Sequence, residues 1–135
     1  MDTFTISPIG IIHSELKKPE DAPLFYNEGA PNATLEVFTP FHPALYRIKK
    51  GDELVVITWL HLADRKVLQV HPRGDVLNPL TGVFLTRSPD RPNPLGLHRA
   101  RVLAVKDGLL QIGPIEAIDQ TPVIDIKPAL DTNDD

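Results

Sequence analysis

The segment TRSPDRPNPLG, residues 86–96, places two arginines and three prolines between two apolar stretches. Proline fixes φ near about −65° and lacks a backbone donor, so this segment is neither a helix interior nor a central strand. In a stiff loop, Arg91 is suited to planar recognition of a carboxylate or phosphate. The alternative is that Asp90 and Arg91 pair with each other or with water. Ser88 is interpreted as a turn-forming hydroxyl rather than a nucleophile, because no G-x-S-x-G motif is present.

Histidines and carboxylates are the candidates for proton transfer. The histidines do not follow H-E-x-x-H or H-x-H spacing, so no metal site is predicted; they are His13, His42, His61, His71 and His98. His61 ends the longest apolar run, where it is either a strand-end residue in contact with water or a proton acceptor at the rim of a site. Asp119 and Asp125 are candidates for a shared site. The absence of cysteine excludes disulfides, thiolate metal sites and cysteine nucleophiles.

The segment DQTPVIDIKP, residues 119–128, alternates so that Val123, Asp125 and Lys127 share one face of an expected strand. If that face is inward, the acid and the base need partners, because unpaired buried charges are costly. They then form a polar wall of a ligand pocket. If the face is outward, they form a solvated ion pair of little energetic value.

Short strands separated by turns must position these residues. Alternating or apolar stretches rich in β-branched residues predict strands, with the first interrupted near Pro8, at residues 4–14, 33–38, 53–62, 66–72, 81–86, 95–105, 106–113 and 123–128. The longest nearly continuous apolar run, residues 53–62, is expected to be a central strand. A long loop is predicted over residues 15–32, and one or two helical turns from Pro43 to Gly51.

Two local patterns are especially informative. In residues 95–105, one face carries Leu97, Arg99 and Arg101, and the other is expected to carry His98, Ala100, Val102 and Ala104. The dipeptide Asp107-Gly108 predicts a tight hairpin. With fourteen prolines spread along the chain, these patterns indicate one all-β domain: a small barrel, or a sandwich, of seven or eight short strands with at most one short helix.

Composition narrows the function classes. The chain has 135 residues, 41% of them hydrophobic and 24% charged, which fits a single globular domain. No apolar stretch predicts a membrane span or a signal peptide, which suits a cytoplasmic protein. A net charge of −4 argues against a general polyanion binder. Neither a G-x-G-x-x-G nucleotide motif nor a phosphate-binding G-x-x-x-x-G-K-[ST] loop is present.

Three segments in order, PIGIIHS, GVFLTRSPDRPNPLGL and DQTPVIDIKP, resemble the TsaA-like family, whose TrmO type comprises S-adenosylmethionine-dependent tRNA methyltransferases. The resemblance runs from about residue 6 to residue 128. It implies a barrel domain over residues 1–128, and the acidic residues that follow indicate a solvated tail, residues 129–135. It also implies bound S-adenosylmethionine, a homodimer with the cofactor near the subunit interface, and methylation of N6-threonylcarbamoyladenosine in tRNA.

The resemblance transfers the family's motifs residue by residue. The S-P-x-R-P-N-P-x-G element and its flanking positions imply cofactor-binding roles for Arg87, Ser88, Arg91, Asn93, Pro94, Gly96 and Leu97. The D-x-T-P-V-x-D-I-K-P element implies the same for Thr121, Asp125 and Lys127. As catalytic residues we expect Arg91, with His61 or Asp119 handling a proton on the side of the methyl acceptor.

The chain departs from the family pattern at several places. Many members have histidine where this chain has Asp90, and another family histidine is replaced by Glu53. A proline-arginine-glutamine element of the first long loop is absent. These departures leave other acceptors open, namely a small molecule or another modified nucleoside. A non-catalytic barrel that binds S-adenosylmethionine or RNA is the alternative from a different functional class, although few aromatic residues are available for base stacking.

Overall fold

Six antiparallel strands close into a barrel in the computed structural model, which describes residues 1–22 and 29–130. The order around the barrel is β1-β2-β7-β6-β3-β8. Their bounds are Gly10–His13 for β1, Ala33–Val37 for β2, Glu53–Trp59 for β3, Leu95–Lys106 for β6, Leu109–Gly113 for β7 and Pro122–Pro128 for β8. A separate two-stranded ribbon pairs β4 (Gln69–Val70) with β5 (Thr81–Gly82). The all-β barrel predicted from the sequence is confirmed.

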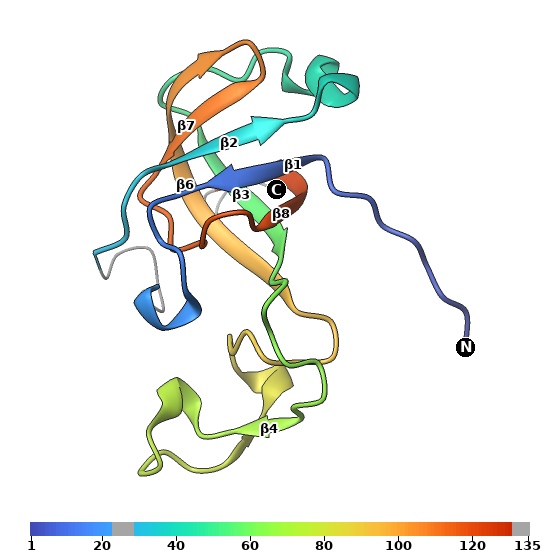
Figure 1. Ribbon diagram of the computed structural model, residues 1–135, viewed down its shortest axis with the longest axis vertical. Coiled ribbons are helices and arrows are strands. Elements are labelled where there is room, and N and C mark those ends of the chain that lie inside the picture. Colours follow the sequence, from blue (N-terminus) through green and yellow to red (C-terminus); the bar gives the residue numbers. More distant parts are fainter. Residues whose placement is uncertain (23–28, 131–135) are drawn as a thin grey trace.

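Helical structure is limited to 3-10 turns in the described part of the chain. Three of them have three residues each: η1 (Pro19–Asp21), η3 (Pro72–Gly74) and η4 (Val83–Leu85). The longest, η2, covers Thr39–Leu45 and lies over one end of the barrel (Figure 1). None of the helices in residues 1–22 and 29–130 has the length and apolar character needed to cross a membrane.

The barrel interior is an aliphatic core supplied by alternating residues of every barrel strand. Because successive side chains of a strand point to opposite faces, inward rows of β-branched and aliphatic residues fill the closed barrel. The core comprises Ile12, Ala33, Leu35, Val37, Leu54, Val56, Ala100, Val102, Leu110, Ile112, Ile115, Ala117 and Val123.

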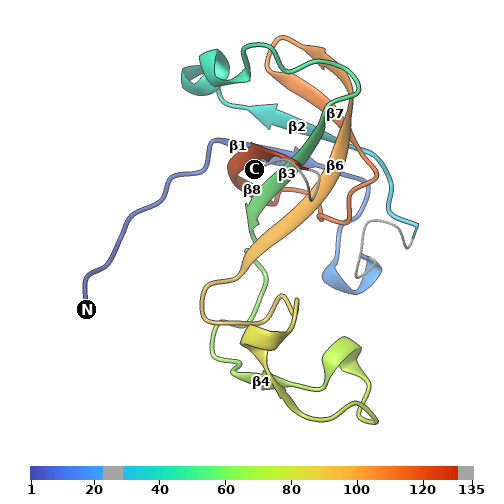
Figure 2. The ribbon, with the colours of Figure 1, turned by 180° about the vertical axis from the view of Figure 1, so that it is seen from behind.

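The longest barrel strand, β6, extends beyond the core toward residues 60–94. It pairs with β3 from Glu53↔Arg101 to Trp59↔Leu95. The chain between the two strands therefore leaves and re-enters the barrel at the same end, and it carries the β4–β5 ribbon below the barrel (Figures 1 and 2). We call residues 60–94 the excursion.

The alternation predicted for β6 is present up to Val102, since His98 and Ala100 are buried and Arg99 and Arg101 are exposed. Ala104 does not follow it. The pairing of β6 with β7 shifts register between Val102 and Ala104, which turns Ala104 outward. The predicted hairpin is confirmed: Asp107 (φ 51°) and Gly108 (φ 79°) connect β6 to β7.

Several predicted element bounds were wrong. The first strand covers only Gly10–His13. The backbone of Ile9 still bonds to Val123 and Phe38, and the residues before it lead away from the barrel as an extended arm (Figure 1). The central strand stops at Trp59, where a turn begins, with the Ala63 N–H donating to the Leu60 carbonyl (3.0 Å). The helical segment is Thr39–Leu45 rather than residues 43–51. The backbone of Arg47 is in the left-handed region (φ 77°), so a right-handed helix cannot continue to Gly51.

Two further strands were predicted too long. Of residues 66–72 only Gln69–Val70 pairs, and of residues 81–86 only Thr81–Gly82 does. Beyond Gly82 the chain coils into η4, closed by the Thr86 N–H bonding the Val83 carbonyl (3.0 Å). Of the long loop predicted over residues 15–32, residues 23–28 lie outside the described residues, as do residues 131–135 of the acidic tail.

Candidate functional site

A cavity of about 670 Å³ lies where the excursion meets the barrel. Three segments supply most of its wall: the turn after β3, the loop of residues 86–91 and the first residues of β6. Residues 116–118 and Thr121 complete it from the segment before β8, together with Pro19 and Ala22 near η1. We call this space the loop cavity. Its lining combines aliphatic and aromatic side chains with a few polar groups, which is typical of small-molecule sites.

The loop of residues 86–96 is fixed by its own side chains. Arg91 Nη2 donates to the carbonyl oxygens of Val83 and Thr86, the latter at 2.6 Å. Thr86 Oγ1 donates to the Val83 carbonyl (2.9 Å) and accepts the Ser88 N–H (3.1 Å). The Arg91 guanidinium group therefore folds back onto the loop that carries it. Asp90 and Arg91 do not pair with each other, which was one alternative considered from the sequence. Arg91 bonds to the backbone of residues 83 and 86, and Asp90 bonds to the backbone N–H of Asp64.

Two residues that the sequence analysis did not identify hold this loop from the turn after β3. The Asp64 N–H donates to Asp90 Oδ1 (2.8 Å). Arg65 donates from Nε to the Pro92 carbonyl (2.7 Å) and from Nη2 to Asn93 Oδ1 (3.2 Å), and its guanidinium carbon lies 5.0 Å from the centre of the Trp59 ring. The loop is thus braced on both sides, which explains how a charged, proline-rich segment keeps one conformation.

A buried chain of three polar side chains lies at the floor of the loop cavity. Thr58 Oγ1 lies 2.6 Å from His98 Nε2, and His98 Nδ1 lies 2.7 Å from Glu116 Oε1. The side chains of His98 and Glu116 are only 6% and 15% exposed, and Thr58 is fully buried. We call these residues the Thr58–His98–Glu116 chain.

Two buried side-chain atoms of the described residues lack a hydrogen-bond partner, Arg91 Nε and Glu116 Oε2. Both residues line the loop cavity. Leaving a buried polar atom unpaired costs about 1–3 kcal/mol, and more when the group is charged. A donor and an acceptor that are both unsatisfied beside one cavity therefore indicate a site shaped for a polar ligand.

Gly96 makes this arrangement possible for a steric reason. It lies opposite Thr58 in the β3–β6 pairing. A Cβ atom at this position would lie 2.5 Å from Thr58 Oγ1 and 2.7 Å from His98 Nε2, well inside contact distance. The absence of a side chain at Gly96 thus leaves space for the hydrogen bond between Thr58 and His98.

The structure brings together seven of the predicted site residues at the loop cavity: His61, Arg87, Ser88, Arg91, Gly96, Leu97 and Thr121. Asn93 and Pro94 belong to the same loop but do not line the cavity: Asn93 Oδ1 accepts a hydrogen bond from Arg65, and Pro94 is buried. Asp119, Asp125 and Lys127 lie elsewhere. The predicted roles of all of these residues in catalysis and cofactor binding stay predictions.

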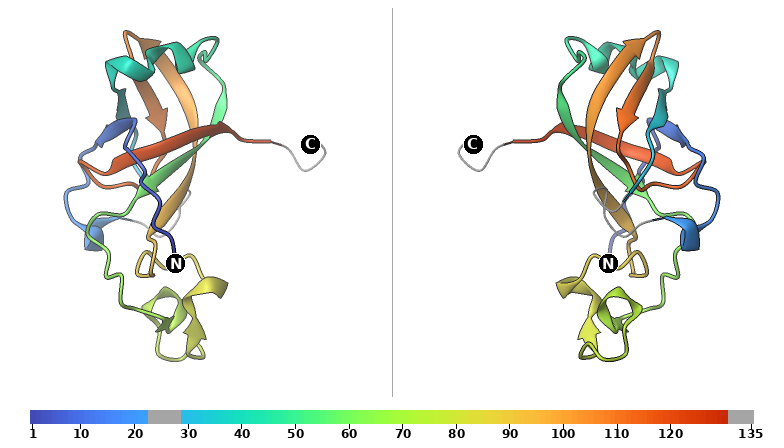
Figure 3. Two further views of the ribbon diagram at one scale, coloured as in Figure 1. Left: turned by 90° about the vertical axis from the view of Figure 1, so that its right-hand side faces the viewer. Right: turned by 90° about the vertical axis from the view of Figure 1, so that its left-hand side faces the viewer.

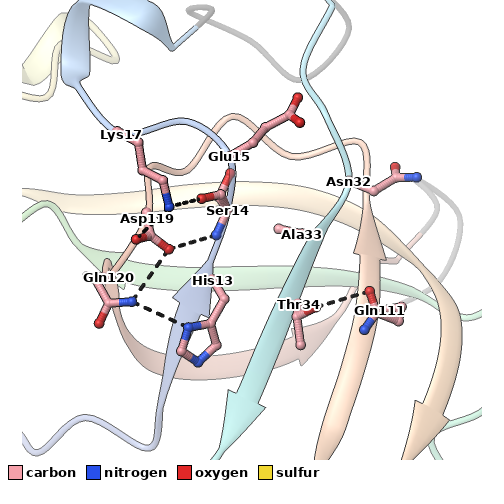
Figure 4. A pocket seen from close by; sticks show the side chains of 10 residues that line it. All are labelled: His13, Ser14, Glu15, Lys17, Asn32, Ala33, Thr34, Gln111, Asp119 and Gln120. Carbon is pink, nitrogen blue, oxygen red and sulfur yellow. Dashed lines mark hydrogen bonds and ion pairs between the residues drawn. The ribbon is translucent and has the colours of Figure 1, made fainter.

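Asp119 lines a second, more polar depression, drawn in Figure 4. We call it the polar hollow; it is formed by His13, Ser14, Glu15, Lys17, Asn32, Ala33, Thr34, Gln111, Asp119 and Gln120. Asp119 accepts the Ser14 N–H (2.9 Å) and pairs with Lys17 (3.0 Å). The hydrogen bond from the Ser14 N–H, with help from Lys17, lowers the pKa of Asp119 below its ordinary value. That shift favours the ionised carboxylate and weakens it as a base.

Asp125 and Lys127 form an ion pair of 3.3 Å with side chains 50% and 65% exposed. The pairing of β8 with β3 shifts register between Ile57 and Thr58, where Ile57 faces Asp125 and Thr58 faces Val123. This bulge breaks the alternation that put Val123 on the same face as the two charged residues. Val123 is buried, whereas the two charged residues lie farther along β8, opposite Ile57 and Val55 of β3, and do not line the loop cavity. Figure 3 shows β8 running across the barrel above the excursion.

Comparison with known proteins identifies the family. Residues 11–135 match the model of the tRNA-methyltransferase O N-terminal domain. A protein of Methanothermobacter thermautotrophicus described as a probable S-adenosyl-L-methionine-binding protein is 37% identical over 91% of this chain and 88% of its own length. One of Methanocaldococcus jannaschii with the same description is 45% identical over 69% of this chain and 77% of its own. The chain belongs to the TrmO family, and the resemblance to TsaA-like proteins is confirmed.

Solved structures agree with this assignment. A crystal structure of TrmO from P. aeruginosa superimposes with a TM-score of 0.76 at 30% identity and covers 96% of this chain. A second TrmO structure gives a TM-score of 0.75, also at 30% identity. This chain spans 56% and 57% of the length of those two solved chains.

Proposed function

We propose that the chain is an S-adenosylmethionine-dependent methyltransferase domain whose cofactor and methyl acceptor meet in the loop cavity. One observation carries the proposal: the two family motifs lie far apart in the sequence, yet both line the same cavity, through residues 86–91 and through Thr121. The names of the archaeal relatives and of the solved neighbours support the same cofactor and reaction.

The residues present fit such a cofactor. The loop cavity has the size of a small-molecule site, and the unpaired Arg91 Nε–H and Glu116 Oε2 offer one donor and one acceptor beside aliphatic lining. In the proposal Arg87, Ser88, Arg91 and Leu97 hold the cofactor. S-adenosylmethionine, when bound, supplies an electrophilic methyl group attached to a positively charged sulfur.

The protein's own contribution is positioning and exclusion of water. The loop of residues 86–96 is already fixed by Arg65 and Arg91, so little conformational freedom remains to be lost when a ligand binds. In this proposal Asn93 and Pro94 stabilise the loop and do not contact the cofactor. Asp125 and Lys127 do not contact the cofactor either.

As the methyl acceptor we propose N6-threonylcarbamoyladenosine in tRNA, supported by the match to the tRNA-methyltransferase O domain. The net charge of −4 favours a second candidate, a free modified nucleoside or another small acceptor, because a tRNA contact benefits from basic surface. Mass spectrometry of nucleosides after incubation with bulk tRNA or with the free nucleoside distinguishes the two candidates by which of them gains a methyl group.

Cofactor binding is tested first, by isothermal titration calorimetry with S-adenosylmethionine and its demethylated product. We expect one site per chain with micromolar affinity or better. Absence of binding would refute the proposal. Binding without methyl transfer to tRNA, nucleosides or small acceptors would instead identify a non-catalytic S-adenosylmethionine-binding barrel.

A homodimer is part of the proposal. The excursion and its junction with β6 expose many large apolar side chains: Leu62, Leu68, Val76, Leu77, Leu80, Phe84, Leu85, Leu95 and Leu97. Clusters of this kind typically mark protein-protein contact surfaces. Analytical ultracentrifugation should find a dimer that Leu77→Asp with Leu85→Asp converts to a monomer, and a monomeric wild type would refute this part of the proposal.

A further inference from the structure

The Thr58–His98–Glu116 chain ends in an oxygen that nothing in the described part of the protein satisfies. Glu116 accepts one hydrogen bond on Oε1 from His98, while its Oε2 is buried and unpaired beside the loop cavity. The three residues come from β3, β6 and the segment before β8, and they lie outside the two family motifs. The oxygen is thus held in place from behind and lacks a partner.

The hydrogen-bond partners fix the proton positions in this chain. An ionised carboxylate only accepts hydrogen bonds, so His98 Nδ1 carries the proton donated to Glu116 Oε1. In the neutral ring Nε2 is then an acceptor, and Thr58 Oγ1 donates to it. The carboxylate of Glu116 therefore fixes the tautomer of His98, and Thr58 occupies the other ring nitrogen. Together these two hydrogen bonds orient the carboxylate.

We propose that Glu116 accepts a hydrogen bond from the N–H group that is to be methylated and takes up its proton during transfer. This inference rests on the proposed methyltransferase function and assigns the base for it. Within it, Glu116 is the catalytic residue, and His98 and Thr58 are positioning residues that act through Glu116.

The step balances in atoms and charge. The acceptor nitrogen gains a methyl group as a new N–C bond forms, and it gives its proton to Glu116 Oε2. The electron pair of the broken S–C bond remains on the sulfur, which becomes a neutral thioether. Glu116 is then a neutral carboxylic acid until it releases the proton to water after the product leaves. No oxidant, metal or covalent enzyme intermediate is required.

The other candidate bases are less suitably placed. Asp119 lies in the polar hollow and pairs with Lys17, and Asp90 accepts the Asp64 N–H. His61 is exposed at the rim of the loop cavity. Only Glu116, among these four, combines burial with an unpaired acceptor oxygen.

The test compares matched variants of the full chain with bulk tRNA or the free nucleoside as acceptor. Glu116→Gln keeps the shape of the side chain and loses the base, and we expect kcat to fall about 100-fold or more. Glu116→Asp keeps a carboxylate and should retain more activity than Glu116→Gln. His98→Asn, which disturbs only the positioning, should lower kcat about tenfold.

Two readouts separate a catalytic role from a structural one. Calorimetric affinity for the demethylated cofactor product should change less than twofold in Glu116→Gln. The wild type should lose kcat at acidic pH, and this acid loss should be absent from Glu116→Gln. The other titratable groups around Glu116 are His98 on β6, His61 on the turn after β3, and Arg87, Asp90 and Arg91 on the loop; all remain in that variant.

Glu36→Gln is the matched control, because Glu36 also pairs with a histidine but on the exposed barrel surface. Its kcat and pH profile should equal those of the wild type. If the wild type transfers methyl groups and Glu116→Gln does so equally well, or if Glu116→Asp is no better than Glu116→Gln, the inference is wrong while the proposed function stands. If the wild type neither binds the cofactor nor transfers methyl groups, the proposed function itself fails.

Discussion

Two histidine-glutamate pairs on one barrel show how burial changes the value of the same chemistry. His13 Nε2 lies 2.9 Å from Glu36 Oε1 at the polar hollow, and His98 Nδ1 lies 2.7 Å from Glu116 Oε1 at the loop cavity. The first pair has side chains 43% and 44% exposed, and the second has side chains 6% and 15% exposed. Residue types and distances are nearly equal, but the surroundings differ.

The difference teaches where function is to be expected. Water solvates the exposed His13–Glu36 pair, so that pair contributes little and its atoms have alternative partners. The His98–Glu116 pair is mostly buried, so its hydrogen bond is electrostatically stronger and an unpaired atom in it is costly. A polar group that is expensive to bury and still lacks a partner is the better candidate for contact with a ligand.

The largest expected effect comes from filling the space behind the loop cavity. Gly96→Ala would push a Cβ against Thr58 Oγ1 and His98 Nε2, at 2.5 and 2.7 Å. We expect about 1–3 kcal/mol lower stability from overpacking, measured by denaturant unfolding, and a kcat reduced about 100-fold. Gly82→Ala is the control, because nothing lies within 4 Å of its Cβ position. Equal behaviour of the two variants would contradict the steric role of Gly96.

A smaller effect is expected from loosening the loop of residues 86–96. Arg65→Ala removes two hydrogen bonds to that loop and the contact with Trp59. Because Arg65 is exposed, we expect about 1 kcal/mol of lost stability. Affinity for S-adenosylmethionine, measured by calorimetry, should fall about tenfold because the loop must then be ordered on binding. Arg65→Lys keeps the positive charge but lacks the planar guanidinium group with its two donors, so it should behave like Arg65→Ala. Wild-type affinity in both variants would show that the loop does not depend on Arg65.

At the polar hollow, Asp119→Asn should act on stability and leave kcat unchanged. The folded-state pKa of Asp119 is lowered by the Ser14 N–H and Lys17, so the stability linked to it is complete above the unfolded pKa. It is lost as pH falls through the folded pKa. Urea unfolding at neutral pH should show about 1 kcal/mol of destabilisation, and the difference from wild type should vanish in strong acid. A large loss of kcat would reinstate Asp119 as a catalytic candidate.

The smallest effect is expected at the exposed pair. His13→Asn removes the contact with Glu36, and we expect the free energy of unfolding to change by less than about 0.5 kcal/mol. Thermal unfolding at low and high salt checks this value. His98→Asn, measured in the same way, should lower the free energy of unfolding by more, because His98 is buried; equal changes in the two variants would mean that exposure does not distinguish the two pairs.

Local patterns predicted much of the fold. Alternation in β6 located the buried His98, Ala100 and Val102, and the Asp107-Gly108 dipeptide located the hairpin. The predicted ends of the strands were less accurate. A strand ends where its partner strand stops pairing with it, and a local sequence pattern does not identify that partner. The register shifts that turn Ala104 outward and separate Val123 from Asp125 have the same origin.

The sequence identified the loop of residues 86–96 but not the floor of its cavity. Thr58 lies in an apolar run and Glu116 in a segment without periodicity, so neither stood out. One clue was available: an inward-facing His98 between apolar residues needs buried polar partners. The identity of these partners depends on the β3–β6 register and on the path of residues 114–121. Both are features of the tertiary structure that a local sequence pattern does not contain.

The pairing of Trp59 with Leu95 makes the excursion an insertion into what would otherwise be a simple hairpin. Its two ends lie side by side across neighbouring strands, about 5 Å apart, whatever the length of chain between them. The length and path of residues 60–94 therefore place no constraint on the register of β3 and β6. One wall of the loop cavity is built from this single connection, whereas the Thr58–His98–Glu116 chain stands on two barrel strands and the segment before β8.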